Sequence, residues 1–170
     1  RHTANIMKHM FGTLFFISES GTLDPNLAES YSVSDDGKEY TFKLKEGLTC
    51  HDGEPLTAED AAYTFNRVVD PDLAFVGNSA GFVFPSIDFK EARADSELEV
   101  TIVMGAPNHI ALGLISEVYV HCKDSYEKMS KEEAATNPIG SGPYEFVKWD
   151  KGSQIVMKKA ANPPIPTNFE

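Results

Sequence analysis

Paired runs of alternating apolar and polar residues, each pair joined by a turn signal, constrain this chain most. The clearest run is "YTFKLK", residues 40–45, which follows an Asp-Gly turn signal. Alternation with a period of two places the apolar side chains on one face of a half-exposed antiparallel strand. Residues 87–104 and 144–159 repeat the pattern. Hairpins dominate and no strand–helix–strand unit stands out, so the sequence predicts an α+β fold of antiparallel hairpins with packed helices.

Helix signals lie between the hairpins. Thr57 is a good N-cap, and two acidic residues follow it in the first turn. Ser130 and Glu133 fit a capping box, which marks a second helix start. Apolar spacing also predicts helices within residues 3–17 and within 108–115, where Asn108 is the expected cap, whereas residues 73–86 have no clean period and are predicted to be a loop.

Charge and hydropathy limit the classes of function. The 170 residues carry 15 basic and 26 acidic side chains, for a net charge of -11. An acidic chain repels phosphate backbones, so nucleic acid is not an expected partner. No apolar run is long enough to span a bilayer. The first residues show no cleavable signal and no initiator Met, and the last are rich in proline, so we expect a piece of a longer protein.

Few residues suggest chemistry. His51 beside Asp52 could form an acid–base pair, but an Asp-Gly turn with a solvent-facing His51 ring explains the pattern better. His121 beside Cys122 could suggest a metal ligand or a thiolate, yet no further ligand has matching spacing. Nucleophile, zinc-protease and phosphate-loop motifs are absent. The sequence therefore predicts no catalytic residues, no metal site and no cofactor.

The stretch "NPIGSGPYEF", residues 137–146, contains two prolines and two glycines, the residue types that most affect backbone conformation. Pro138 is expected to stop a helix, and Pro143 to fix the entry into a strand. Gly140 and Gly142 are expected to allow positive φ. Such a stretch suits either an ordinary loop or a crossover between two domains.

Taken together, these motifs resemble a known family. "LAESYSVSDDGKEYTFKLKEGLTCHDGEPLTAEDAAYTFNRV", residues 27–68, looks like the signature region of the family 5 extracellular solute-binding proteins. These are the oligopeptide-, dipeptide- and nickel-type binding components of ABC importers. "NPIGSGPYEFVKW", residues 137–149, matches a second block of the family in the expected order. The sequence departs from the pattern at Cys50, where an aromatic is usual, and after Lys159, where only Asn162-Pro163 survives.

The resemblance implies part of a two-lobed fold. The chain is similar to part of lobe I of a periplasmic-binding-protein type II fold, including its inserted subdomain. Residues 1–22 would belong to the main lobe, 23–136 to the inserted subdomain, and 137–170 to the incomplete return to the main lobe. The second lobe, which supplies much of the ligand cleft in this family, is absent from the sequence.

The resemblance also implies a function and a site. The protein would capture a small solute, such as a peptide, a metal chelate or a sugar, and deliver it to an ABC permease. It would be periplasmic or extracellular, associated with the membrane through the transporter. Two alternatives stay open: a secreted hydrolase that uses His51 or His121, and a stand-alone interaction module. The expected solute-facing residues are Phe11, Phe75, Glu117 and Tyr119.

The two cysteines, Cys50 and Cys122, have two readings. Their segments belong to one subdomain in the family, so a bridge between them would be allowed in an oxidising compartment. Because Cys50 occupies a position where the family buries an aromatic, we predict instead two free, largely buried thiols.

Overall fold

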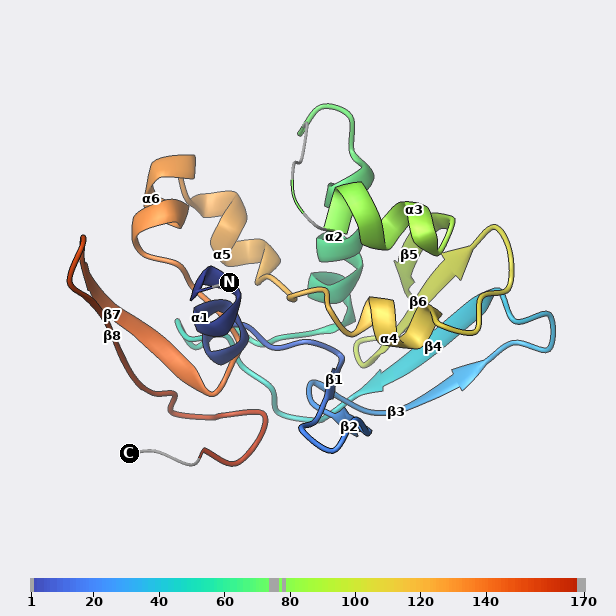
Figure 1. Ribbon diagram of the computed structural model, residues 1–170, viewed down its shortest axis with the longest axis horizontal. Coiled ribbons are helices and arrows are strands. Elements are labelled where there is room, and N and C mark those ends of the chain that lie inside the picture. Colours follow the sequence, from blue (N-terminus) through green and yellow to red (C-terminus); the bar gives the residue numbers. More distant parts are fainter. Residues whose placement is uncertain (1, 74–76, 78, 168–170) are drawn as a thin grey trace.

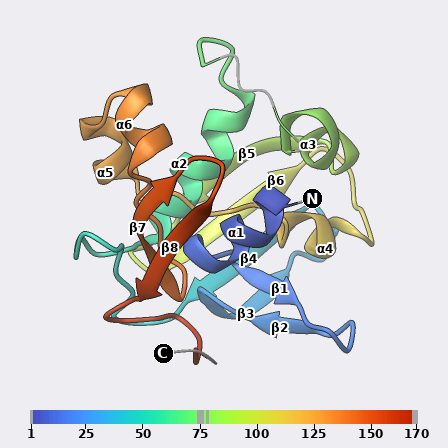
Figure 2. The ribbon, with the colours of Figure 1, turned by 60° about the vertical axis from the view of Figure 1, so that its left-hand side comes forward.

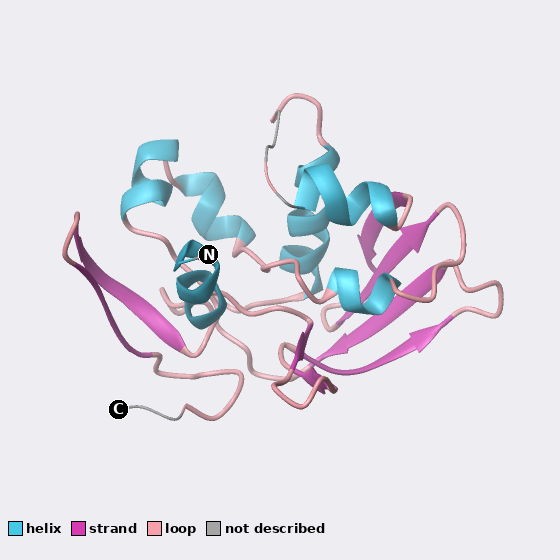
Figure 3. Ribbon diagram, viewed as in Figure 1, coloured by secondary structure: helices cyan, strands magenta, loops and turns pink. Residues whose placement is uncertain are grey.

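A four-stranded antiparallel sheet is the largest sheet of the computed structural model, which describes residues 2–73, 77 and 79–167. Its strands lie in the order β3-β4-β6-β5, so two consecutive hairpins, β3-β4 and β5-β6, join through the antiparallel pairing of β4 with β6. Figures 1 and 3 show this sheet on one side of the molecule and a smaller hairpin on the other. The sheet consists of β3 (Ala28–Val33), β4 (Glu39–Leu44), β5 (Phe89–Ala94) and β6 (Glu99–Met104).

The alternating pattern of β4 produces the predicted apolar face. Tyr40, Phe42 and Leu44 are buried, and Phe42 pairs with Val100 on β6. The helix α2 (Ala58–Val69) packs on β5 and β6. Burial of the sheet's apolar face against this helix is the main source of the core's stability.

The helix α2 begins where its caps predict. The Thr57 side chain accepts a hydrogen bond from the Glu59 N–H. The Asp60 carboxylate accepts one from the Thr57 N–H at 2.7 Å, which completes the capping box. The helix ends at Val69, before the Asp70-Pro71 pair. The second predicted capping box is also present and opens a short exposed helix.

The first helix is shorter than the sequence predicts. The helix α1 (His2–Met10) stops before Gly12, and β1 (Phe15–Ile17) pairs with β2 (Leu23–Pro25) instead of continuing it. A side chain at Gly12 would collide with the buried Leu27 side chain. Close packing of Gly12 on the core therefore ends the helix. The chain continues in an extended conformation, although the spacing of its apolar residues predicts a longer helix.

The loop predicted over residues 73–86 is wrong for its second half. A π-helical turn, Ser79–Val83, runs into α3 (Phe84–Ser86). Phe84 lies 4.6 Å from Phe89 and 5.7 Å from Phe65, measured between ring centroids. Packing of these rings, rather than a helical period, holds the turn in place. Asn108 is not the N-cap that the sequence predicts. It lies two residues before the N-cap Ile110 of α4 (Ala111–Ile115), and its side-chain oxygen accepts from the Ile110 N–H.

The C-terminal hairpin lies beside the first helix. It is formed by β7 (Tyr144–Asp150) and β8 (Gln154–Lys159), and both Figure 1 and Figure 2 show α1 next to it. Before it come two short helices, α5 (Lys123–Lys128) and α6 (Lys131–Thr136).

In the described part of the chain, no helix has the length and apolar character needed to cross a bilayer. The division at residues 22 and 136 stays a prediction.

Candidate functional site

One face of α2 holds segment 119–123, which begins with the expected site residue Tyr119. The buried Asp60 accepts from the Lys123 N–H at 2.8 Å, in addition to its capping contacts. Thr64, one turn later, accepts from the His121 N–H at 2.8 Å. On the other side, the Val120 N–H donates to the Gly12 carbonyl. Segment 119–123 is therefore fixed between α2 and the chain that leaves α1.

This fixation brings three rings together. Phe11 is buried, and its ring centroid lies 6.4 Å from that of Tyr119 and 5.0 Å from that of His121. Tyr119 and His121 both keep part of their surface exposed. The three residues form an aromatic wall between α1 and segment 119–123.

An arginine extends the wall along α2. The guanidinium of Arg67 lies 5.4 Å from the ring centroid of Tyr63 and 5.8 Å from that of Tyr126. The Tyr126 ring also contacts His121, with 4.8 Å between centroids. Buried polar atoms normally have hydrogen-bond partners. Within the described residues, however, Arg67 Nε and His121 Nδ1 are buried and have none.

Burial and charge perturb the titration of this wall. Burial, with a smaller contribution from the nearby Arg67 charge, lowers the pKa of His121 to about 4. Burial raises the pKa of Tyr126 to about 12. The pKa of Tyr119 is also raised, first by burial and then by the negative charge of Glu117. His121 is thus neutral and both tyrosines are protonated near neutral pH.

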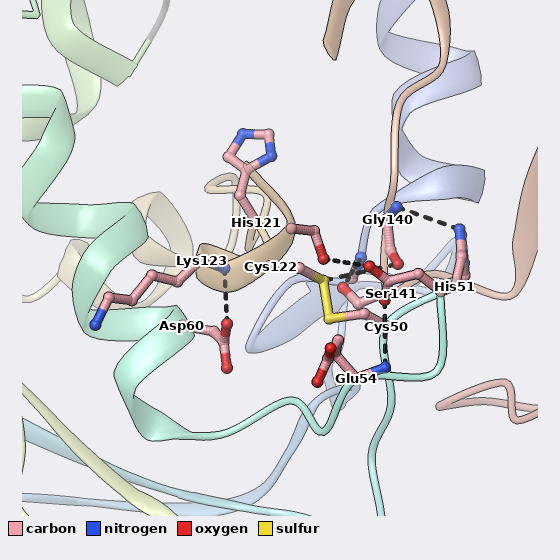
Figure 4. Close-up of a disulfide and its surroundings, with 12 residues drawn as sticks. Cys50, His51, Glu54, Asp60, His121, Cys122, Lys123, Gly140 and Ser141 are labelled. Carbon is pink, nitrogen blue, oxygen red and sulfur yellow. Dashed lines mark hydrogen bonds between the residues drawn. A yellow bond between two sulfur atoms is a disulfide. The ribbon is translucent and has the colours of Figure 1, made fainter. Parts of the chain in front are cut away.

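The prediction of two free thiols is wrong. Cys50 and Cys122 form a disulfide, with their Cα atoms 6.3 Å apart (Figure 4). Both residues are buried, so the burial part of the prediction is confirmed. Segment 119–123 is held against α2 by Asp60 and Thr64, and this places Cys122 opposite the turn that carries Cys50.

The solvent-facing role predicted for His51 is also wrong. Its Nδ1 accepts from the Gly140 N–H at 3.2 Å, and its Nε2 lies 2.9 Å from the Gly142 carbonyl oxygen. The His51 N–H donates to the Gly140 carbonyl. This pattern requires a neutral ring with its proton on Nε2. Burial lowers the pKa of His51, partly opposed by the Gly142 hydrogen bond and by Asp52.

Gly140 and Gly142 serve a different purpose from the one predicted. Neither has a positive φ; among the described glycines, positive φ occurs elsewhere. A Cβ on Gly140 would overlap the Met10 carbonyl oxygen, and one on Gly142 would lie 2.6 Å from the Met10 carbonyl carbon. The Gly142 N–H donates to the Met10 carbonyl at 2.9 Å. The glycines therefore permit close backbone approach to the end of α1.

The predicted site residues have different outcomes. Phe11 and Tyr119 lie together, and Glu117 is exposed close enough to perturb Tyr119. Phe75 lies outside the described residues. The sequence did not single out Arg67 or Tyr126, and it indicated His121 only as a candidate metal ligand or hydrolase residue. A signal for Arg67 existed, because Asp60, Thr64 and Arg67 recur at helical spacing on one face of α2.

The geometry offers little for catalysis. Both ring nitrogens of His51 are occupied by backbone groups, so it is not poised as a general base. In the described residues, no three His, Cys, Asp or Glu side chains are arranged to hold a metal ion. A cavity of about 560 Å³ next to the disulfide is lined by several carboxylates, including Glu54, Glu59 and Glu97. Its charge does not suit an anion.

Comparison with known proteins gives the family. The model for bacterial extracellular solute-binding proteins, family 5 Middle, matches residues 22–163. A probable di/tripeptide-binding protein 5 from Pseudomonas aeruginosa (strain UCBPP-PA14) is 30% identical over 167 residues, covering 87% of this chain and 31% of its own length.

Solved structures agree with this match. The ABC transporter substrate-binding protein CtaP from Listeria monocytogenes superposes with a TM-score of 0.79 at 30% identity, over 93% of this chain and 32% of its own. NikZ from Campylobacter jejuni, solved in complex with Ni(L-His), gives 0.78 at 28% identity, over 90% and 30%. The α+β fold and its likeness to part of a periplasmic-binding-protein type II fold are confirmed. The chain spans about a third of the length of these relatives, and it belongs to the bacterial extracellular solute-binding proteins of family 5.

Proposed function

We propose that the protein is the solute-binding component of an ABC importer. It captures a small solute, such as a peptide or a metal chelate, and passes it to a membrane permease without altering it. The observation that carries the proposal is the family match over residues 22–163. The names of the relatives, a di/tripeptide-binding protein and a nickel–histidine complex, support these two solute classes.

In this proposal the aromatic wall is one side of the solute cleft. Phe11, Tyr119 and His121 present flat rings, two of them partly exposed, which suits the apolar lining of a small-molecule site. Residues 1–22 and 137–170 belong to the main lobe and 23–136 to the inserted subdomain. The protein acts outside the cytoplasm, in the periplasm or at the cell surface, where the permease holds it at the membrane.

The test uses the full-length gene product. Calorimetry with di- and tripeptides and with nickel–histidine should show saturable binding. Chromatography of the released solute should recover it unchanged. Turnover of the solute, or failure to bind any member of the panel, would contradict the proposal.

A further inference from the structure

We propose that the Cys50–Cys122 disulfide is a redox switch that controls how tightly the protein binds its solute. A dithiol reductant opens the switch by reducing the bond. The inference deepens the proposed function and rests on it, since the bond would act on the aromatic wall. The bond joins segments 72 positions apart in the sequence, and Figure 4 shows it between the turn at His51 and the segment at Lys123.

The Cys50 end of the bond leads to one half of the aromatic wall. The adjacent His51 binds the Gly142 carbonyl through Nε2 at 2.9 Å. The Gly142 N–H in turn donates to the carbonyl of Met10, the residue before Phe11. A displacement of the turn that carries Cys50 is therefore transmitted to the ring of Phe11.

The Cys122 end of the bond leads to the other half of the wall. Tyr119 and His121 lie just before this cysteine, in segment 119–123. Their ring centroids lie 6.4 and 5.0 Å from that of Phe11. The disulfide thus spans the two halves of the wall, and the distance between its two ends helps to set the spacing of these rings.

Reduction changes this spacing because both cysteines are buried in the hydrophobic core. Two sulfur atoms that are no longer bonded repel each other at a distance where bonded ones do not, so two thiols need more room than a disulfide. A close-packed interior leaves little free volume to accept them. The two segments must therefore move apart, and the rings of the wall move with them.

The fold remains after reduction because hydrogen bonds hold each segment. The segment of Cys122 is bound to α2 through Asp60 and Thr64, and to Gly12 through the Val120 N–H. The turn on the other side keeps the contacts of its histidine ring. A protein with two folded arrangements that differ in affinity for a ligand responds to that ligand as a two-state switch.

A cavity gives a reductant its route to the bond. Cys50 and Cys122 are largely buried but line the cavity of about 560 Å³, together with Glu54, Glu59 and Glu97. One thiolate of the dithiol attacks a sulfur of the bond and forms a mixed disulfide, which its second thiolate then breaks. Two electrons and two protons pass to the cysteines, and the reductant leaves as a disulfide. Carboxylates repel anions, so negatively charged reductants should react slowest.

The experiment measures solute binding by the full-length gene product before and after reduction. The protein is reduced with dithiothreitol, which is then removed under nitrogen because dithiols bind nickel. Calorimetry with di- and tripeptides and with nickel–histidine should show dissociation constants that rise about tenfold or more on reduction. Circular dichroism should show that the reduced protein is still folded at the temperature of the titration.

A matched variant and a second readout accompany this measurement. Cys50→Ala/Cys122→Ala lacks the bond, so it should bind equally with and without the dithiothreitol treatment. Hydrogen exchange reports which segments move. Reduction should speed the exchange of amides in segments 119–123 and 137–142, whereas the amides of β4 and β6 should keep their protection.

Reductants of different charge test the route through the cavity. Cysteamine is positively charged, 2-mercaptoethanol is neutral and 2-mercaptoethanesulfonate is negatively charged. Each reduction rate is divided by the rate for the same reagent with the urea-unfolded protein, which corrects for the reactivity of the thiol. The corrected rates should fall in that order. Glu54→Gln/Glu97→Gln should reduce the difference, whereas Glu91→Gln, at an exposed position on β5, should not.

Each outcome decides a different claim. Equal binding by the oxidised and reduced protein, a reduced protein that unfolds, or a response to reductant that persists in Cys50→Ala/Cys122→Ala would overturn the switch and leave the proposed function standing. Equal corrected rates for the three reductants would overturn the cavity as the route. An oxidised protein that binds no member of the panel would contradict the proposed function and the switch with it.

Discussion

At the scale of single residues, His51 is a connector between two segments far apart in the sequence. It binds both the N–H of Gly140 and the carbonyl of Gly142 through its ring. His51→Ala leaves two backbone groups without these partners in a partly buried setting. We expect a loss of about 1–3 kcal/mol in the free energy of unfolding. Urea denaturation measures it, with His109→Ala, at an exposed histidine, as the matched control. Equal midpoints for the two variants would contradict the connector role.

Histidine titration should make stability depend on pH. An unfolded histidine takes up a proton near pH 6.5, whereas the pKa of His121 in the folded protein is lowered to about 4. Between these values the unfolded state binds more protons, so the free energy of unfolding falls as the pH falls from 6.5 towards 4. The lowered pKa of His51 acts in the same direction. The full contribution is present above pH 6.5.

His121→Phe isolates the contribution of that ring. The substitution removes the titrating group and keeps an aromatic ring against Phe11 and Tyr126. Urea melts at a series of pH values should show that the variant loses less stability on acidification than the wild-type protein does. Parallel pH profiles would show that His121 is not the source.

Gly140 is expected to tolerate no side chain. A methyl group there would overlap the Met10 carbonyl oxygen, which belongs to the backbone and cannot move aside cheaply. Gly140→Ala should therefore destabilise by about 1–3 kcal/mol, the usual cost of overpacking. Gly113→Ala is the control, because a Cβ at Gly113 meets nothing within 4 Å. Similar denaturant midpoints for both variants would contradict the close approach.

Residue types in the sequence indicated which positions matter but not how they act. The prolines and glycines of residues 137–146 marked this stretch as one with a restricted backbone. The structure shows that a side chain at Gly140 or Gly142 would collide with a neighbouring segment. The constraint comes from the backbone of α1, more than a hundred residues earlier in the chain, and a local pattern carries no information about such a contact. The same holds for His51, whose partners are distant in sequence.

At the scale of elements, the disulfide ties the turn before α2 to the start of α5. Cys50 and Cys122 are separated by 72 positions, for which the chain-entropy account gives a stabilisation of about 4 kcal/mol. Dithiothreitol should lower the melting temperature of the wild-type protein. The double variant Cys50→Ala/Cys122→Ala should melt at a low temperature with or without the reductant.

Thiol counting completes this prediction. The denatured, unreduced protein should show no reactive thiols, and the reduced protein should show two, from Cys50 and Cys122. Two reactive thiols before reduction would restore the free-thiol reading.

Elements were predictable where local rules agree with packing. The strand β4 and the helix α2 were both recognisable, since alternation and a capping box act within a few residues. The ends of α1 and the turn at Ser79–Val83 were not, because close packing at Gly12 and the contact of Phe84 with Phe89 decide them. The pairing of the cysteines likewise depends on where α2 holds segment 119–123.

At the scale of the whole molecule, the proposed function makes the aromatic wall one side of a solute site. The aromatic wall lies at the surface, with Tyr119 and His121 partly exposed, and the chain spans about a third of the relatives' length. The family was recognisable from two sequence blocks because they preserve turn and cap chemistry. Arg67 and Tyr126 were not recognisable as parts of the wall, because only the folded chain brings them to His121.

We therefore expect the 170-residue chain alone to bind solutes weakly. A tight small-molecule site buries most of its ligand's surface, which a single wall cannot do. With the panel used for the full-length gene product, calorimetry of the isolated chain should give dissociation constants at least about a hundredfold weaker, which corresponds to the loss of roughly 3 kcal/mol of contacts. Circular dichroism must first show that the isolated chain is folded, so that weak binding reports the missing surface rather than unfolding. Sub-micromolar binding by the folded chain would show that the wall around Phe11 and His121 is a complete site.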